Sequence, residues 1–83
     1  MNLVNRIATA LYRRRMDCGW SQTELAATAK VSPTTIREIE SGRRNMRIGT
    51  LEVLAVALGM TSAELLRRAL ALENEPIKME KIT

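Results

Sequence analysis

The 83-residue sequence contains no histidine and a single cysteine, Cys18. The missing histidine excludes a Ser-His-Asp triad, histidine ligation of a metal and the commonest general base near pH 7. One cysteine can form neither an internal disulfide bond nor a cysteine zinc site. A glycine-rich phosphate loop is also missing, and short helices leave little room for a ligand pocket. We therefore expect a protein that is not an enzyme and that uses no metal, cofactor or small-molecule ligand.

Long apolar runs are missing as well. No segment approaches the roughly 20 apolar residues that a membrane span requires. The N-terminus does not have the apolar core of a signal peptide. These features predict a cytoplasmic protein without a membrane partner.

Basic residues are concentrated in the first part of the chain. The whole sequence holds 13 Lys and Arg against 9 Asp and Glu, which gives a net charge of +4. Residues 1 to 50 hold nine basic and four acidic residues, whereas residues 51 to 83 hold four and five. This asymmetry indicates a polyanionic partner for the first part and leaves the second part for packing or association.

Residues 21 to 42 contain consecutive signals for two short helices. Ser21 and Glu24 have the spacing of a capping box, which starts the first of them. Ser32 supplies a side-chain acceptor before Pro33, and this pair starts the second. Gly42 can adopt the left-handed conformation that ends it. Two short helices joined by about four residues predict a helix-turn-helix, although a plain helical hairpin would show the same pattern.

The apolar spacing of the second helix sets its orientation. Ile36 and Ile39 are its inward residues, so its polar residues must point away from the body of the protein. A polar helix of this kind can enter the major groove of DNA with its N-terminal residues against base edges. The outward residues are Pro33, Thr34, Arg37, Glu38 and Ser41.

A basic loop follows at residues 43 to 47. It carries the guanidinium groups of Arg43, Arg44 and Arg47 and the amide of Asn45. Such donors beside a groove-reading helix suit the DNA backbone, so we expect this loop to bind phosphates. The alternative is an ordinary solvated loop.

Three further helices are expected, at about residues 4 to 18, 49 to 58 and 62 to 72, with residues 1 to 3 frayed. A second capping box, from Thr61 to Glu64, starts the last of them. Arg15 lies on the apolar stripe of the first helix, where a charge needs a partner. We expect that partner to be Glu40, at the end of the outward-facing polar helix.

The last expected helix carries more apolar surface than a monomer of this size needs. Part of it is expected to form a dimer surface, because a single small domain has little core of its own. The residues assigned to this surface are Leu65, Leu66, Ala69 and Leu70. Pro76 prevents the helix from continuing. We therefore expect a domain over residues 1 to 72 and a tail over residues 73 to 83, either disordered or forming a short dimerisation strand.

The motifs together resemble the phage-repressor and Cro-type helix-turn-helix proteins, the XRE family. They read, in order, S-Q-T-E-L-A, V-S-P-T-T-I-R-E-I-E-S-G-R-R-N and L-E-V-L-A-V-A-L-G-M-T-S-A-E-L-L, and the likeness covers residues 7 to 70. This resemblance implies an all-α, compact five-helix fold similar to that of lambda repressor, in which helices 2 and 3 form the helix-turn-helix. The R-R-N segment also resembles the restriction-modification controller proteins, small dimeric members that regulate their own operons.

The resemblance implies roles for individual residues. The positions that meet bases in the family are Pro33, Thr34, Arg37 and Glu38. Those that meet phosphates are Gln22, Ser32, Thr35, Arg43, Arg44 and Asn45. Arg47 joins these phosphate contacts only through the donors of the basic loop, not through the resemblance. Arg15 and Glu40 match an ion pair between helices 1 and 3.

Three positions depart from the family pattern. Pro33 replaces a donor-bearing side chain at the first base-contacting position. Arg47 stands where Ser or Thr often caps helix 4, and Arg14 stands where leucine is frequent. These changes affect local contacts and leave the expected fold unchanged.

The sequence as a whole predicts a transcription regulator that binds double-stranded DNA as a homodimer on a near-palindromic operator. Its simplest action would be that of a repressor or autoregulator. The alternative is an antitoxin or another protein-interaction module, whose last helix and tail bind a partner protein such as a toxin.

Overall fold

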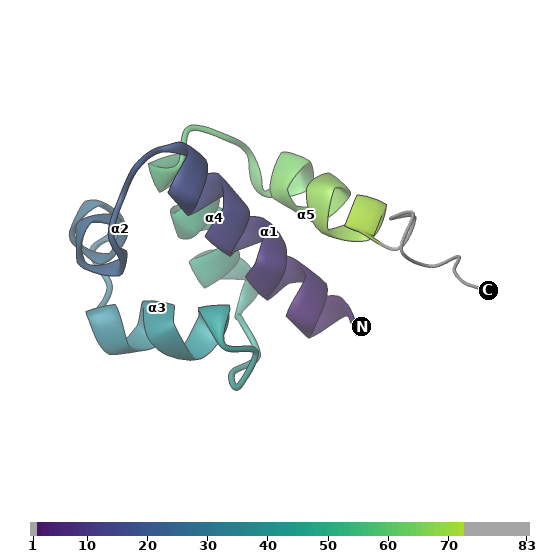
Figure 1. Cartoon of the computed structure of the whole chain (residues 1–83), viewed down its shortest axis with the longest axis horizontal. Coiled ribbons are helices and arrows are strands. Elements are labelled where there is room, and N and C mark those ends of the chain that lie inside the picture. The colour runs from purple at the N-terminus through teal and green to yellow at the C-terminus, as the bar shows by residue number, and fades with distance from the viewer. Residues whose placement is uncertain (1, 73–83) are drawn as a thin grey trace.

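The computed structural model describes residues 2 to 72, and this part of the chain contains five helices and no strand (Figure 1). The helices are α1 (Leu3–Asp17), α2 (Gln22–Ala29), α3 (Pro33–Glu40), α4 (Ile48–Ala57) and α5 (Ser62–Ala71). The predicted all-α fold is therefore confirmed, and α2 with α3 forms the helix-turn-helix. The tail predicted at residues 73 to 83 lies outside the described residues.

Local side-chain hydrogen bonds start the two helices of the motif as predicted. Ser21 Oγ accepts from the Glu24 amide at 3.0 Å, and the Ser21 amide donates to Glu24 Oε1 at 2.7 Å. This reciprocal pair completes the capping box at the start of α2. Ser32 Oγ accepts from the Thr35 amide at 3.1 Å, and Pro33 occupies the first helical position of α3.

Two other predicted helix starts need correction. α1 begins at Leu3, in the segment expected to be frayed, because the Asn2 side chain accepts from the Asn5 amide at 2.8 Å and caps the helix. At α5 only half of the expected capping box forms. Thr61 Oγ1 accepts from the Glu64 amide at 3.0 Å, but the Glu64 carboxylate does not return to the backbone. It pairs instead with basic side chains three and four residues further along the helix.

The turn between α2 and α3 contains a residue in a conformation that the sequence did not indicate. Lys30 has φ +60 and ψ 43, the left-handed region, and its amide bonds back to the carbonyls that end α2. Such values are uncommon for a residue other than glycine. The packing of α2 against α3 therefore imposes a turn that the local sequence does not favour.

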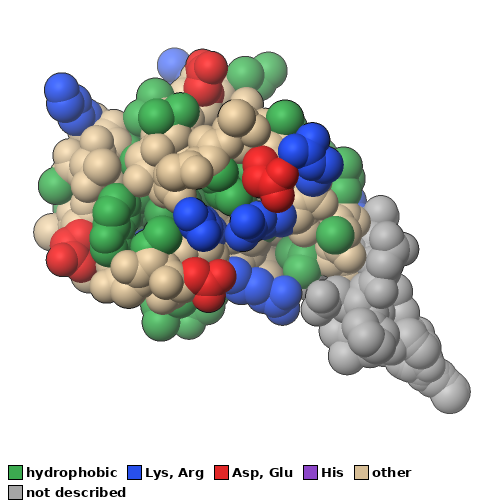
Figure 2. Space-filling view, turned by 90° about the horizontal axis from the view of Figure 1, so that it is seen from above, with side chains coloured by type: hydrophobic (Ala, Val, Ile, Leu, Met, Phe, Trp, Pro, Cys, Tyr) green, Lys and Arg blue, Asp and Glu red, His purple; other side chains and the backbone are tan. Residues whose placement is uncertain are grey.

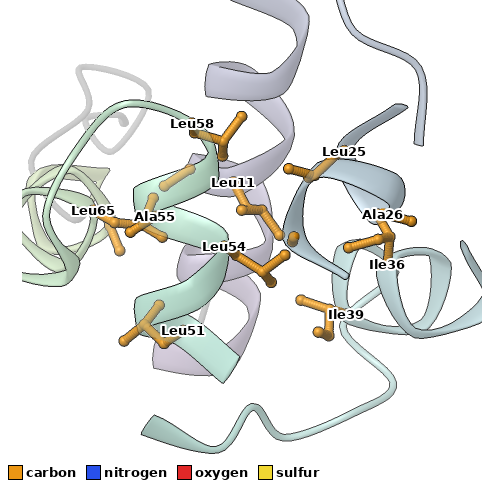
Figure 3. Packing of buried hydrophobic residues seen from close by; sticks show 13 residues of the cluster. Leu11, Leu25, Ala26, Ile36, Ile39, Leu51, Leu54, Ala55, Leu58 and Leu65 are labelled. Atoms are coloured by element: carbon orange, nitrogen blue, oxygen red, sulfur yellow. The ribbon is translucent and has the colours of Figure 1, made fainter. Parts of the chain in front are cut away.

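The helices enclose a shared apolar core, shown in Figure 3. α1 packs against α3 and α5, α4 packs against α2 and α5, and α2 packs against α3. Each described helix contributes at least one of the largest buried side chains, which are Leu11, Leu25, Ile36, Ile39, Leu54, Leu58 and Leu65. α3 is thus anchored by Ile36 and Ile39, as its apolar spacing predicted.

Part of the predicted dimer surface belongs to this core. Leu65 and Ala69 each have 0% exposure, because α5 packs against both α1 and α4. They cannot meet a second molecule unless the core opens, so the prediction for these two residues is wrong. Leu66 is partly buried and Leu70 is 48% exposed, so these two positions remain accessible from outside.

No single helix in the described range is long and apolar enough to cross a membrane. α4 and α5 reach the required length and hydropathy only when they are counted together, and they are bent by 95° relative to each other.

Candidate nucleic-acid interface

α3 presents a polar face on the outside of the molecule. It lies along one edge in Figure 1, and no other helix of the described chain passes over its outer side. Thr34 and Arg37 are exposed, and the side chain of Glu38 is 46% exposed. The face predicted to meet base edges is therefore open to solvent, which docking in a groove requires.

A hydrogen bond orients the arginine on this face. Arg37 NH2 donates to Thr34 Oγ1 at 3.0 Å. Residues three apart are neighbours on a helix surface, so the bond directs the guanidinium toward the N-terminal end of α3. That end is the part of a recognition helix that approaches base edges.

The basic loop after α3 lies partly against the helix. Its residues Arg43, Arg44, Asn45 and Arg47 are all exposed. Arg44 NH1 donates to Glu38 Oε1 at 3.0 Å and lies 3.4 Å from Thr35 Oγ1. Arg44 therefore runs along the flank of α3. This contact could not be predicted from the sequence, because it depends on how the loop turns.

The loop and the start of α4 line a polar surface pocket of about 240 Å³. Its lining includes Thr35, Arg44, Asn45, Arg47 and Thr50. Among the helices described, α4 alone has an N-cap residue, Arg47, whose side chain makes no capping hydrogen bond. The amides of its first turn thus add positive potential to a pocket that already holds two arginines.

A buried polar cluster holds α1, α2 and α3 together behind the exposed face. Arg15 Nε donates to Glu40 Oε2 at 2.7 Å and Arg15 NH2 to Glu40 Oε1 at 2.9 Å, with side chains only 8% and 5% exposed. The predicted ion pair is therefore confirmed. Arg15 NH1 also donates to the carbonyl of Trp20 at 2.7 Å. The hydrogen bond with Glu40 raises the pKa of Arg15 further above its ordinary value, despite the opposing effect of burial.

Gln22, predicted to bind phosphate, is drawn into this cluster. Its Nε2 donates to Glu40 Oε1 at 3.0 Å, and its side chain is partly buried. An amide nitrogen carries two protons, so this bond leaves donor capacity for a phosphate oxygen. The first residue of α2 is thus connected to the last residue of α3 through one carboxylate.

Arg14 has a structural role that the sequence analysis missed. Its Nε donates to the carbonyl of Leu58 at 3.0 Å, where α4 ends. A basic side chain at a helix C-terminus satisfies a carbonyl that lacks an intrahelical partner. No local signal identifies it, because Arg14 and Leu58 are 44 positions apart in the chain.

The side of the molecule opposite α3 has a mixed surface. Figure 2 looks at that side, and it shows basic, acidic and apolar side chains interspersed. Among residues 2 to 72, no group of three or more cysteine or carboxylate side chains is placed to hold a metal ion. The arrangement of donors around α3 is suited to binding an extended polyanion.

These features define a helix-turn-helix DNA-binding domain: a polar helix braced by a second helix, with a basic loop at its end. The sequence matches the helix-turn-helix family over residues 11 to 66, and the chain belongs to this family, in its XRE branch. Helix-turn-helix transcription regulators of this type bind double-stranded DNA, and they are typically not enzymes.

Three similar proteins illustrate the relationship. The "Neisseria hypothetical transcription factor" of Neisseria meningitidis serogroup B (strain ATCC BAA-335 / MC58) is 36% identical over 52 residues. That alignment covers 63% of this chain and 49% of the relative, so the chain matches about half of the relative's length. The clp gene regulator ClgR from Corynebacterium glutamicum is 32% identical, with a TM-score of 0.81 over 86% of this chain and 91% of that one. The restriction-modification controller protein C.Esp1396I shares the fold at 21% identity, with a TM-score of 0.83 over 90% of this chain and 96% of that chain.

Proposed function

We propose that this transcription regulator binds a specific near-palindromic operator as a homodimer and represses transcription, including that of its own gene. The observation that carries the proposal is the exposed polar face of α3, with Thr34, Arg37 and Glu38 open to solvent beside the basic loop. Occupied promoter DNA would block RNA polymerase. The 32% identity to the clp gene regulator ClgR supports a regulatory role for this chain.

Arg37 is the residue to which we assign most of the base discrimination. A guanidinium can donate two hydrogen bonds to O6 and N7 of guanine, which is worth about 1 to 3 kcal/mol against a wrong base. Thr34 can contact a thymine methyl group, and Glu38 can accept from the N4 amino group of cytosine. Pro33 offers only an apolar contact at the first position of the helix.

The phosphate contacts surround this face. Ser32 and Thr35 stand at the N-terminal turn of α3, where their hydroxyl groups lie 2.9 Å apart. Gln22 lies at the start of α2, and its second amide proton can reach the DNA strand. The remaining contacts come from the basic loop and its polar pocket, through Arg43, Arg44, Asn45 and Arg47. Such contacts fix the position of a protein on the duplex without reading its sequence.

The homodimer would place two copies of α3 in successive major grooves about 34 Å apart. Leu66 and Leu70 of α5 are the accessible members of the surface predicted for this association. A chain of this size gains stability from a second copy because its own core is small.

Selection of bound sequences from a random duplex pool tests the proposal. We expect enrichment of a palindrome whose half-sites are about one helical turn apart. Sedimentation of the protein alone, at micromolar concentration, should show a dimer. Arg37→Ala should fail to enrich the same sequence, whereas Arg67→Ala, on α5 and away from α3, should enrich it normally. A pool with no enriched sequence would refute specific binding.

A protein-interaction module is the second candidate. Apolar side chains on α4 favour it, because Ile48 is 82% exposed, Val53 43% and Val56 66%. A monomer that copurifies with the product of a neighbouring gene and binds no duplex selectively would support this candidate over the regulator.

A further inference from the structure

The basic loop and the recognition face are joined by one ion pair that lies in the surface expected to meet DNA. Arg44 NH1 donates to Glu38 Oε1 at 3.0 Å, and the two side chains are 50% and 46% exposed. Arg44 NH1 also lies 3.4 Å from Thr35 Oγ1, which itself shares a hydrogen bond with Ser32 Oγ. The half-exposed guanidinium is therefore held by groups of α3 on one side.

The pair has a consequence for binding to DNA of arbitrary sequence. Arg44 can neutralise a phosphate only if it leaves the Glu38 carboxylate or brings that negative charge close to the strand. Either outcome weakens the electrostatic attraction that dominates binding to random DNA. The penalty is modest, because an exposed ion pair changes an equilibrium constant, here the affinity for random DNA, by a factor of about five or less.

A suitable base sequence removes this penalty. The major-groove edges of cytosine and adenine carry exocyclic amino groups, and a carboxylate can accept a hydrogen bond from them. If such a group donates to Glu38, Arg44 is released to a phosphate while both side chains keep a partner. The exchange is available only where an amino group faces Glu38.

We propose that Glu38 determines specificity by acting through Arg44. On a duplex whose bases offer no amino donor to Glu38, Arg44 stays paired with Glu38 and makes no phosphate contact. On a duplex that offers such a donor, Arg44 is released and binds a phosphate. This inference rests on the proposed function. It adds a coupling between the base contact of Glu38 and the phosphate contact of Arg44.

Binding of Glu38→Gln to random duplex and to the selected operator, measured at several salt concentrations, tests the inference. On random duplex we expect affinity to rise about two- to fivefold, because Arg44 is no longer neutralised. The slope of log affinity against log salt should steepen by up to about 0.9, the value for one additional phosphate contact. The ratio of operator to random affinity should fall by at least about fivefold.

Two controls separate this coupling from a general charge effect. Glu64→Gln removes a carboxylate that pairs with Arg67 and Arg68 on α5, so it makes the same change in charge at a comparable exposed pair. It should leave both affinities unchanged. In an Arg44→Ala background, Glu38→Gln should no longer strengthen binding to random duplex.

The inference would be overturned if Glu38→Gln weakened operator binding and left random-duplex binding equal to that of Glu64→Gln. Additive effects of Glu38→Gln and Arg44→Ala on random duplex would overturn it as well. Failure of the proposed function looks different, because the unmodified protein would then prefer no duplex at all.

Discussion

Replacement of Glu40 by alanine is the most informative perturbation of this fold. The substitution removes both hydrogen bonds that Glu40 accepts from Arg15 and the one that it accepts from Gln22. It leaves the guanidinium of Arg15, a residue that is 6% exposed as a whole, without a countercharge. Breaking a buried ion pair by removing one partner costs about 3 to 5 kcal/mol. A domain of this size has a total stability of roughly 4 to 11 kcal/mol.

Glu40→Ala should therefore remove a large fraction of the free energy of unfolding. Urea unfolding can be monitored by far-ultraviolet circular dichroism. The variant should unfold at a lower urea midpoint, with an unchanged slope of the free energy of unfolding against urea concentration. Glu52→Ala is the matched control, because Glu52 is an exposed carboxylate within α4. Surface changes of that kind usually fall within about 0.5 kcal/mol.

The double variant Arg15→Met with Glu40→Leu distinguishes an uncompensated charge from lost hydrogen bonds. Replacing both partners of a buried pair with apolar side chains is often neutral or stabilising. Gln22 is only partly buried and can turn to water, so we expect the double variant to recover most of the loss. A double variant as unstable as Glu40→Ala would refute this reasoning, and so would a cost for Glu40→Ala near that of the control.

Four further predictions concern local features. Gly42 and Gly19 both have positive φ, at +77° and +73°, but only at Gly42 would a Cβ overlap a neighbouring side chain. Alanine should cost about 1 to 2 kcal/mol in urea unfolding at either position, because the atom that the Gly42 Cβ would meet is the terminal amide oxygen of Asn5, an exposed side chain that can turn aside. A much larger cost at Gly42 than at Gly19 would contradict this reasoning. Arg37→Ala should lower operator discrimination by about 1 to 3 kcal/mol and spare random duplex, while Arg43→Ala should flatten the salt slope by about 0.9 in fluorescence anisotropy. A uniform loss for Arg37→Ala would assign Arg37 to phosphates. Hydrogen bonds from neighbouring arginines lower the pKa of Glu64 below its ordinary 4.5, so its contribution to stability is complete well above pH 4.5 and is lost as the pH falls through the lowered pKa. The difference in melting temperature between the unmodified protein and Glu64→Gln should therefore disappear in acid, and a difference that persists there would contradict the assignment.

Features determined by short-range contacts could be predicted from the sequence. The starts of α2 and α3 followed from Ser21 and Ser32, because a capping side chain bonds an amide only three residues away. The outward face of α3 followed from Ile36 and Ile39, since two inward residues fix the rotation of a short helix. The pairing of Arg15 with Glu40 could be predicted because a charge on an apolar stripe must be compensated.

Features that depend on the arrangement of helices could not be predicted in this way. An apolar stripe identifies side chains that must be buried, but it does not identify the helix or the second molecule that buries them. Leu65 and Ala69 are covered by α1 and α4 within the same chain, so the stripe gave no evidence for a second copy. The cap that Arg14 provides for α4 and the contact of Arg44 with Glu38 likewise follow from tertiary proximity.

The exposed face of α3 depends on polar contacts as much as on the core. A helix of eight residues is not stable in isolation, so its orientation comes from what it packs against. Ile36 and Ile39 bury its inner side, but apolar contacts are non-directional and permit small rotations. The hydrogen bonds from Arg15 and Gln22 to Glu40 are directional, and they fix the C-terminal end of α3 relative to α1 and α2. Under the proposed function Gln22 binds a phosphate and Arg37 reads the bases. The Glu40 carboxylate would then set both the phosphate contact of Gln22 and the angle at which Arg37 approaches the bases.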